Sequence, residues 1–282
     1  MKIAWITGAG GLIGNYLLTA DGRSHAGFAA VGLTRGKVDL LDFAAVSSLF
    51  QSEMPDLIIH CAALSKSPEC QASPQLARQI NVDVTRHLAT LAANIPFIFL
   101  SSDLVFDGRK GDYIEPDQPN PLSVYAETKV LAEQVVLANP LHTVIRTSLN
   151  GGTSPRGDRG FNEELRRVWA DGKSTTLFTD EFRCPIPAAV TARAIWEFAG
   201  RYQPGLYHLA GAEKLSRWQI GQLLAKRWPQ LNPQIRSGSL RDYQGAPRSP
   251  DTSLNCDKIQ RILPSKLPGL TQWLAGHPDE SF

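Results

Sequence analysis

The sequence lacks the features that would assign it to several specialised classes of protein. Only four of its 282 residues are cysteines, and no two of them are spaced as a CxxC pair. No group of cysteines and histidines has the spacing of a zinc site. No apolar run approaches the roughly 20 residues that a membrane-spanning helix needs, and the first residues do not have the pattern of a signal peptide. We therefore expect no bound metal, no membrane partner and a cytoplasmic location.

Charge of one sign is not in excess either. Lysine and arginine total 29, aspartate and glutamate total 27, and the net charge is +2. Such a balance gives no electrostatic reason to expect nucleic acid as a partner. The apolar fraction of 43% and the charged fraction of 20% are those of an ordinary globular protein. The length suits one large domain or two closely joined ones.

Segments that look like strands alternate with segments that look like helices through the first half of the chain. Continuous apolar runs in such an alternation predict an α/β fold in which helices cover both faces of a parallel sheet. We expect a Rossmann-type, doubly wound sheet in residues 1–148. Residues 149–282 should form mainly a small C-terminal α/β substrate lobe, with a segment near 186–210 that returns to the Rossmann domain. The expected strands and helices of the first half are 2–8, 12–20, 28–34, 56–63, 73–95, 96–102, 121–139 and 142–147.

A glycine-rich turn follows the first expected strand. The stretch TGAGGLIG has a GxxGxxG pattern between a strand and a helix. In dinucleotide-binding proteins the first glycine permits a tight bend, the second lets backbone amides approach a pyrophosphate, and the third lets the helix pack closely. The place of the turn in the chain is what makes the motif informative. It predicts a dinucleotide site, with cofactor contacts from Gly8, Gly11, Leu12, Ile13 and Gly14.

The end of the second expected strand bears on which dinucleotide binds. NAD sites usually have an acidic residue there, whereas this chain has Thr34, Arg35 and Lys37. A cation suits a 2′-phosphate, so we expect NADPH, with NADH as the alternative. Thr34 and Arg35 should contact the cofactor, and Asp39 and Leu40 should flank the adenine. The alternative that Arg35 is a solvated loop charge stays open.

A tyrosine and a lysine four residues apart begin the helix expected at 121–139. Tyr125 and Lys129 share one helical face, and Ser102 ends the preceding strand, at the edge where parallel-sheet enzymes bind ligands. A nearby positive charge lowers the pKa of a phenol, which is ordinarily about 10. Such a phenol can protonate an alkoxide while a serine hydroxyl holds the same oxygen. The pattern predicts hydride transfer between a nicotinamide and a carbonyl or alcohol, with Lys129 also holding the nicotinamide ribose.

These motifs together resemble a known family. TGAGGLIG, the serine before the YxxxK pattern, and YAETK look like the extended short-chain dehydrogenases/reductases. SSDLVFDG, PLSVYAETKVLAE, VIRTS, GLYHLAG and RSPDTSL resemble the dTDP-4-dehydrorhamnose reductase family, most strongly up to Thr147. The resemblance implies reduction of a 4-keto sugar carried on a nucleoside diphosphate. It also implies that Ser102, Tyr125 and Lys129 form the catalytic triad.

The resemblance and the residue types suggest further contacts. Asn81 matches the helix asparagine of these enzymes, and the alternative is an ordinary polar residue on a helix surface. Arg183 and Arg248 could clamp a diphosphate, and Asn162 could bind it from a helix start, but a surface ion pair or a helix cap explains each as well. The residues expected beside the cofactor here are Cys61, Ala62, Ala63 and Asn81. Those expected beside the substrate are Ser65, Ser102, Phe106, Asn162, Arg183 and Arg248.

The sequence departs from the family in segments that line the substrate side. CAALSKS stands where the family usually has NAAAYT, and LNGG follows RTS in place of an aromatic pair. The sequence therefore predicts the reaction and leaves the sugar open. Two other functions also stay open: a sugar-nucleotide epimerase or dehydratase with the same triad, and a non-catalytic NADP-binding regulatory subunit. We expect a small-molecule nucleotide sugar as the partner, and a homodimer stays open.

Overall fold

The core of the molecule is a parallel sheet of six strands. The structure, a computed structural model, describes residues 1–19, 26–280 and 282. Every pairing between neighbouring strands of this sheet is parallel, which confirms the predicted Rossmann-type α/β fold. Across the sheet the strands are β10 (Gly205–Leu209), β5 (His142–Thr147), β4 (Phe97–Ser102), β3 (Leu57–His60), β1 (Lys2–Thr7) and β2 (Phe28–Leu33).

The order of the strands fixes where a ligand can enter. The chain runs from β1 outward to β2, then passes back over β1 to β3 and continues through β4, β5 and β10. The connections that follow β1 and β3 therefore leave in opposite directions. Open α/β sheets bind their ligands at such a switch point, beyond the carboxyl ends of the strands. The glycine turn follows β1 at this point, and residues 61–65 follow β3.

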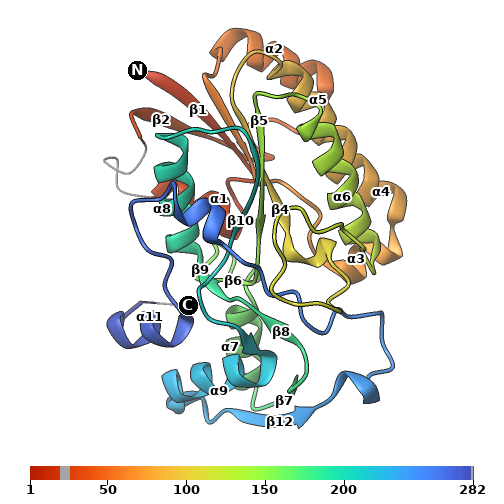
Figure 1. The fold of residues 1–282 in the computed structure, drawn as a ribbon, viewed down its shortest axis with the longest axis vertical. Coiled ribbons are helices and arrows are strands. Elements are labelled where there is room, and N and C mark those ends of the chain that lie inside the picture. Colours follow the sequence, from red (N-terminus) through yellow and green to blue (C-terminus); the bar gives the residue numbers. More distant parts are fainter. Residues whose placement is uncertain (20–25, 281) are drawn as a thin grey trace.

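Helices cover both faces of the sheet because successive side chains of a strand point to opposite faces. Trp5, Ile58 and Phe97 belong to one apolar cluster, which they share with α2 (Phe43–Glu53), α5 (Val84–Leu91) and α6 (Val124–Leu137). Ile6 and Ile59 belong to a second cluster, with α1 (Leu12–Thr19) and α8 (Ala188–Ala199). Figure 1 shows these two sets of helices on opposite sides of the sheet.

The long helix predicted over 73–95 is interrupted. After α3 (Ser67–Ala72), α4 (Pro74–Arg78) runs into a π-helical turn, Gln79–Asp83, before α5 begins at Val84. Single π-turns within a helix are rare and occur frequently at functional sites. This turn carries Asn81, one of the predicted cofactor residues.

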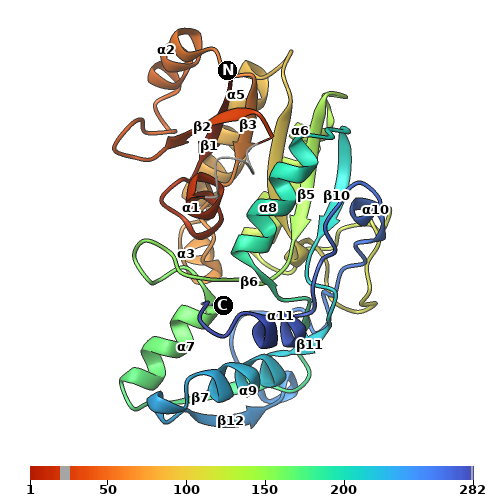
Figure 2. The ribbon, with the colours of Figure 1, turned by 90° about the vertical axis from the view of Figure 1, so that its left-hand side faces the viewer.

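The second half of the chain adds a lobe beyond the carboxyl end of the sheet (Figure 2). The lobe contains α7 (Phe161–Ala170), α9 (Arg217–Arg227), α11 (Leu270–Gly276), and the parallel pair of β7 (Ser174–Phe178) with β12 (Gln234–Gly238). β10 lies in the main sheet and α8 packs on α1, so part of the second half is built onto the core. The predicted domain boundary near residue 148 stays a prediction.

Short strand pairs lie where the lobe meets the core. They are β6 (Asn150–Gly151) with β9 (Ile186–Pro187), and β8 (Phe182–Arg183) with β11 (Leu215–Ser216). The short helix α10 (Asp257–Gln260) packs beside β10. Among the described residues, no helix combines the length and the apolar character that crossing a membrane requires.

Candidate active site

Close backbone contacts shape the glycine turn between β1 and α1. Gly8 has a φ of +65°, and a Cβ atom there would lie 2.7 Å from the backbone nitrogen of Ala62. A Cβ atom on Gly14 would overlap the carbonyl oxygen of Gly8, and the amide of Gly11 donates to this same oxygen at 2.8 Å. Side chains are therefore excluded at positions 8 and 14. The turn lies against the loop after β3, at the switch point of the sheet.

Ser102 and Tyr125 meet beyond the carboxyl end of β4. Ser102 is the last residue of β4, and Ser123 caps α6 by accepting a hydrogen bond from the amide of Ala126, which sets Tyr125 in the first helical turn. Both Ser102 and Tyr125 are only 9% exposed. The two side chains are close enough that Ser102 acts to lower the pKa of Tyr125. Two members of the predicted triad are thus in contact.

Burial raises the pKa of Tyr125, and the neighbouring Asp103 raises it further, against an opposing hydrogen bond with Ser102. This direction contradicts the prediction that Lys129 lowers the pKa of the phenol. Burial removes the water that would stabilise a phenolate. The Nζ of Lys129 also donates its hydrogen bond to the carbonyl oxygen of Leu100 and not to Tyr125. At neutral pH Tyr125 therefore keeps its proton.

Lys129 is buried between α6 and β4. Its side-chain Nζ donates to the carbonyl oxygen of Leu100 at 2.5 Å and lies 3.9 Å from the centroid of the Phe99 ring. Burial lowers the pKa of Lys129 to about 7, although Glu133 and Cys61 act to raise it. A lysine with this pKa changes its charge near neutral pH. Small changes in its surroundings therefore decide whether it is cationic.

Asn81 is buried and holds the loop after β3. Its Oδ1 accepts from the amide of Leu64 at 2.8 Å, and its Nδ2 donates to the carbonyl oxygen of Leu64 at 3.1 Å and to the hydroxyl of Thr128 at 2.9 Å. An exposure of 1% contradicts the alternative that Asn81 is a surface residue. These bonds tie the loop to α6, beside Lys129. The half-buried residues predicted to contact the cofactor from this loop are Cys61, Ala62 and Ala63.

Two cations follow β2, and they differ in their partners: Lys37 is paired, whereas Arg35 has no ion-pair partner among the residues that the structure describes. Lys37 forms an ion pair with Glu53 at 2.8 Å. Thr34 and Arg35 are exposed in the turn that follows the strand. Arg35 is therefore the side chain better placed to meet an anionic ligand. The residues predicted to flank the adenine follow in the same segment, one exposed and one half-buried: Asp39 and Leu40.

Arg183 is buried in an ion pair. One of its guanidinium nitrogens donates to Oδ2 of Asp103 at 2.9 Å and to the hydroxyl of Thr252 at 2.7 Å. The hydroxyl of Ser148 donates to the same oxygen of Asp103 at 2.7 Å, and that of Ser102 donates to Oδ1 at 3.2 Å. Asp103 thus connects Ser102 to the lobe. The guanidinium of Arg183 serves an internal ion pair, which differs from the predicted contact with a diphosphate.

Three arginines surround the buried carboxylate of Glu181. Its oxygens lie 2.9 Å from Arg248, 3.2 Å from Arg217 and 3.4 Å from Arg183. Burial acts to raise the pKa of Glu181, but the three guanidinium groups outweigh it and lower this pKa to about 2. The side chain of Arg248 is 35% exposed. A single carboxylate does not neutralise both Arg217 and Arg248, so positive charge remains where Arg248 reaches solvent.

Two other predicted substrate residues lie inside the protein. Asn162 accepts from the amide of Gly152 at 3.2 Å and donates to its carbonyl oxygen at 2.7 Å, so it anchors the loop that precedes α7. Phe106 is fully buried and stacks on Tyr113 with ring centroids 4.0 Å apart. Both positions differ from the predicted contact with substrate. Ser65, by contrast, is exposed.

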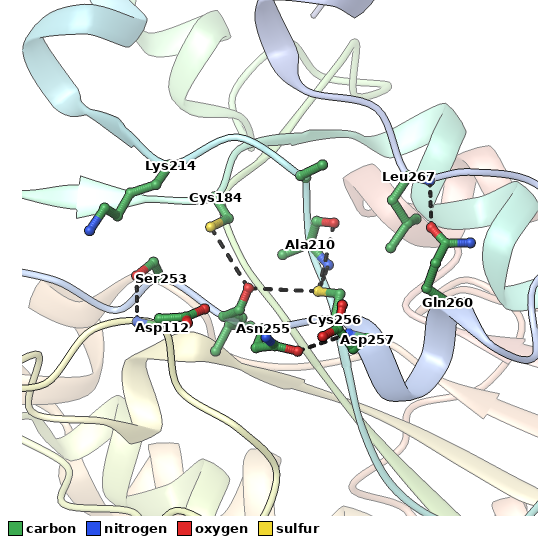
Figure 3. A pocket seen from close by; sticks show the side chains of 13 residues that line it. Asp112, Cys184, Ala210, Lys214, Ser253, Asn255, Cys256, Asp257, Gln260 and Leu267 are labelled. Atoms are coloured by element: carbon green, nitrogen blue, oxygen red, sulfur yellow. Dashed lines mark hydrogen bonds between the residues drawn. The ribbon is translucent and has the colours of Figure 1, made fainter.

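A cavity of about 530 Å³ lies at the carboxyl end of β10. Figure 3 shows Cys184 and Cys256 side by side among its lining residues, and both thiols donate to the carbonyl oxygen of Leu254, at 4.0 and 3.9 Å. Burial raises the pKa of Cys184 to about 11, so the thiol stays protonated at neutral pH. None of the predicted site residues lines this cavity, which is therefore separate from the Ser102–Tyr125 pair.

Three buried carboxylates near the site escape the sequence analysis: Asp103, Glu133 and Glu181. Asp103 directly follows Ser102, and Glu133 lies one helical turn after Lys129. A carboxylate at such a spacing from a predicted catalytic residue is a signal that could have identified these two. Glu181 lies two residues before the predicted substrate residue Arg183, but its other partners, Arg217 and Arg248, come from distant parts of the chain.

Comparison with known proteins identifies the family to which this arrangement belongs. A family model described as the RmlD substrate binding domain matches residues 1–277. The chain belongs to the RmlD substrate-binding family. This membership confirms the resemblance found in the sequence motifs.

Individual relatives within the family differ in their names. The chain is 29% identical over 283 residues to dTDP-4-dehydrorhamnose reductase of Sinorhizobium fredii, covering 95% of this chain and 93% of that protein. It is also 29% identical over 273 residues to methionine adenosyltransferase 2 subunit beta of Xenopus laevis, covering 92% and 82%. The crystal structure of dTDP-4-dehydrorhamnose reductase from Bacillus anthracis in complex with NADP shares the fold, with a TM-score of 0.89, 21% identity and 98% coverage of both chains.

Proposed function

We propose that the protein is an NADP(H)-dependent reductase that reduces the keto group of a nucleotide-linked sugar. The observation that carries the proposal is the buried contact between Ser102 and Tyr125, beside Lys129, at the carboxyl edge of β4. A hydroxyl pair at this edge is what protonation of a substrate oxygen requires. The relative from Sinorhizobium fredii, named a dTDP-4-dehydrorhamnose reductase, supports the same reaction class.

The β1–α1 turn fits a dinucleotide. A Cβ atom would clash at Gly8 and at Gly14, so these two positions of the turn carry no side chain. The turn leads directly into the N-terminus of α1. Such a helix end binds a pyrophosphate through its free amides and its dipole. Leu12 and Ile13 would supply amides, and the exposed Arg35 would meet a 2′-phosphate. The NADP in the Bacillus anthracis reductase structure supports NADP(H) here as well.

The protein's own residues would supply the proton and fix the substrate oxygen. A bound reduced nicotinamide would supply the hydride for the carbonyl carbon. Tyr125, held as a neutral phenol by burial, gives its proton to the oxygen of that carbonyl. Ser102 donates a hydrogen bond to the same oxygen and orients it. Lys129, in its cationic form, holds the ribose.

Positive charge near Arg248 would suit the diphosphate of the substrate. Arg217 and Arg248 share the carboxylate of Glu181 with Arg183, which Asp103 already pairs. A guanidinium with spare donors is a good partner for phosphate. Arg248 is therefore the residue that we retain from the predicted clamp, together with its unpredicted neighbour Arg217.

The proposal is tested by NADPH oxidation against a panel of 4-keto sugars linked to dTDP, UDP and GDP. We expect rapid oxidation with at least one member, and the preferred nucleotide identifies the substrate class. A panel in which NADPH binds but no sugar is reduced contradicts the proposal. Reversible epimerisation of a sugar without net NADPH consumption would instead indicate the epimerase alternative.

A non-catalytic regulatory subunit is the second candidate function. It is favoured by the relatives named methionine adenosyltransferase 2 subunit beta, which match over 92% of this chain. This function requires NADP binding, a change in the kinetics of a methionine adenosyltransferase catalytic subunit, and no sugar reduction. Measuring the kinetics of that enzyme with and without the protein separates the two candidates.

A further inference from the structure

A carboxylate lies one helical turn beyond Lys129, on the buried side of α6. Glu133 is 3% exposed. Its Oε1 accepts from the hydroxyl of Ser101 at 2.5 Å and from Nε of Arg146 at 3.0 Å, and its Oε2 accepts from a second nitrogen of Arg146 at 2.7 Å. Ser101 directly precedes Ser102 on β4, and Arg146 belongs to β5. Side chains of β4 and β5 therefore hold this carboxylate in place, next to the strand end that carries Ser102.

The partners of Glu133 are groups that pair with a carboxylate. A guanidinium that binds both oxygens and a hydroxyl donor each stabilise a carboxylate. Arg146 also lies 3.4 Å from Nε2 of His208 and over the ring of Phe106. Burial, followed by the charge of Arg146, lowers the pKa of His208 to about 4, so this histidine is neutral and adds no second cation.

The other ionisable groups that face Lys129 are uncharged at neutral pH. Burial, with Lys129 as a smaller cause, lowers the pKa of His60 on β3 to about 3. Burial raises the pKa of Cys61, in the loop after β3, to about 12. Tyr125, on the same helix, keeps its proton. None of these three groups supplies an anion beside Lys129, whereas Glu133 supplies a carboxylate that also pairs with Arg146.

We propose that Glu133 is a positioning residue of the active site, whose carboxylate keeps the buried Lys129 cationic and so able to hold a cofactor ribose. Lysine and glutamate at i and i+4 lie on one helical face and attract each other. The attraction is stronger in a buried site than in water, because the effective dielectric constant is lower. The role in catalysis rests on the proposed function, whereas the coupling between the two charges does not.

The direct test is the titration of Lys129 by NMR in the intact protein with ¹³C-labelled lysine and no added ligand. Lys129→Met assigns the signal. We expect a midpoint near 7 in the unchanged protein. Glu133→Gln removes the charge with little change of shape and should lower the midpoint by about one pH unit or more. Glu133→Asp, which keeps the charge, should restore most of the shift.

A matched control lies on the same helix. Glu127 is exposed, so Glu127→Gln should leave the midpoint where it is. If Glu133→Gln does not fold because Arg146 is left unpaired, Glu133→Gln combined with Arg146→Gln carries the same prediction. The midpoint should still fall, because Glu133, whose charge acts to raise the pKa of Lys129, is removed in both variants.

NADPH binding supplies a second readout. Binding that needs a cationic lysine weakens as the pH rises through the pKa of Lys129, so in Glu133→Gln this weakening should begin at lower pH. An unchanged Lys129 midpoint in Glu133→Gln, or an equal shift in Glu127→Gln, overturns the inference. Failure of the proposed function would look different: the titration shifts would persist, but no sugar would be reduced.

Discussion

At the scale of single residues, Tyr125 shows what spacing can and cannot reveal. The YxxxK pattern and the serine before it correctly pointed to side chains that the fold brings together. The pattern gave the wrong sign for the pKa of the phenol, because the pKa depends on burial by residues distant in sequence. At neutral pH the phenol carries its proton with either sign, because its ordinary pKa is already about 10. A raised pKa makes it a weaker acid than the spacing predicted.

In the proposed site, Arg35 is the residue on which the choice between NADPH and NADH depends. Arg35→Ala should weaken NADPH binding by about 10- to 100-fold, because a charge-assisted bond to the 2′-phosphate is lost. NADH has no 2′-phosphate, so its affinity should stay nearly unchanged. Fluorescence titration with both cofactors measures the ratio. Arg109→Ala, at a side chain that is 83% exposed, is the control and should affect neither. Equal weakening of both cofactors by Arg35→Ala would contradict the assignment.

At the scale of elements, the glycine turn offers a matched pair of substitutions. Gly8→Ala forces a side chain into a backbone conformation with a φ of +65° and against Ala62, so the turn must distort. Gly10→Ala adds a methyl group where nothing lies within 4 Å. We expect Gly8→Ala to lower both the melting temperature and NADPH affinity, and Gly10→Ala to change neither. A similar loss in the two variants would show that the close approach to Ala62 is unimportant.

His60 makes the β3 strand a source of acid sensitivity. It is hydrogen-bonded to Thr7 and Thr85, and burial lowers its pKa from 6.5 to about 3. Between these values the unfolded chain binds a proton that the folded protein does not, so the free energy of unfolding falls as the pH decreases. Between pH 7 and pH 5, the decrease in the free energy of unfolding should be about 2 kcal/mol smaller in His60→Gln than in the unchanged protein. Urea unfolding at both pH values measures it, and an unchanged pH dependence would contradict this account.

The elements themselves were predictable where one local pattern dominates. The apolar runs at 96–102 and 142–147 became β4 and β5 almost residue for residue. The helix predicted over 73–95 failed in its middle, because the π-turn at Gln79–Asp83 depends on Asn81 bonding a loop and a second helix. Helical periodicity is a local pattern and does not predict hydrogen bonds to residues distant in the chain.

At the scale of the whole molecule, the Asp103–Arg183 ion pair joins the sheet to the lobe. Each side chain is about 5% exposed or less, so Arg183→Met leaves the buried carboxylate of Asp103 without its ion pair, and Asp103→Asn leaves the buried Arg183 with only its longer ion pair to Glu181. Each substitution should cost about 3–5 kcal/mol of stability, and the double variant less than the sum. Asp171→Asn, which breaks an exposed pair with Lys173, is the control and should cost under about 1 kcal/mol. Additive losses in denaturant unfolding would show that the pair does not couple.

The contacts inside the lobe could not be predicted from the sequence. Arg183 and Asn162 have the chemistry of phosphate ligands, yet the fold commits one to Asp103 and the other to Gly152. Those partners are 80 and 10 residues away in the chain, and nothing in the local pattern distinguishes a ligand from a buried brace. The Rossmann half was easier to predict from the sequence, because each of its motifs lies within a short stretch of the chain.

We propose that Tyr125 protonates a carbonyl oxygen during NADPH-dependent reduction of a nucleotide-linked sugar. The most direct measurement compares kcat of the unchanged protein and Tyr125→Phe, with NADPH and the best sugar of the panel, together with NADPH affinity. Loss of the proton donor should lower kcat by about 100- to 10,000-fold and leave the NADPH Kd nearly unchanged. A phenylalanine variant that reduces the sugar as fast as the unchanged protein would contradict the account.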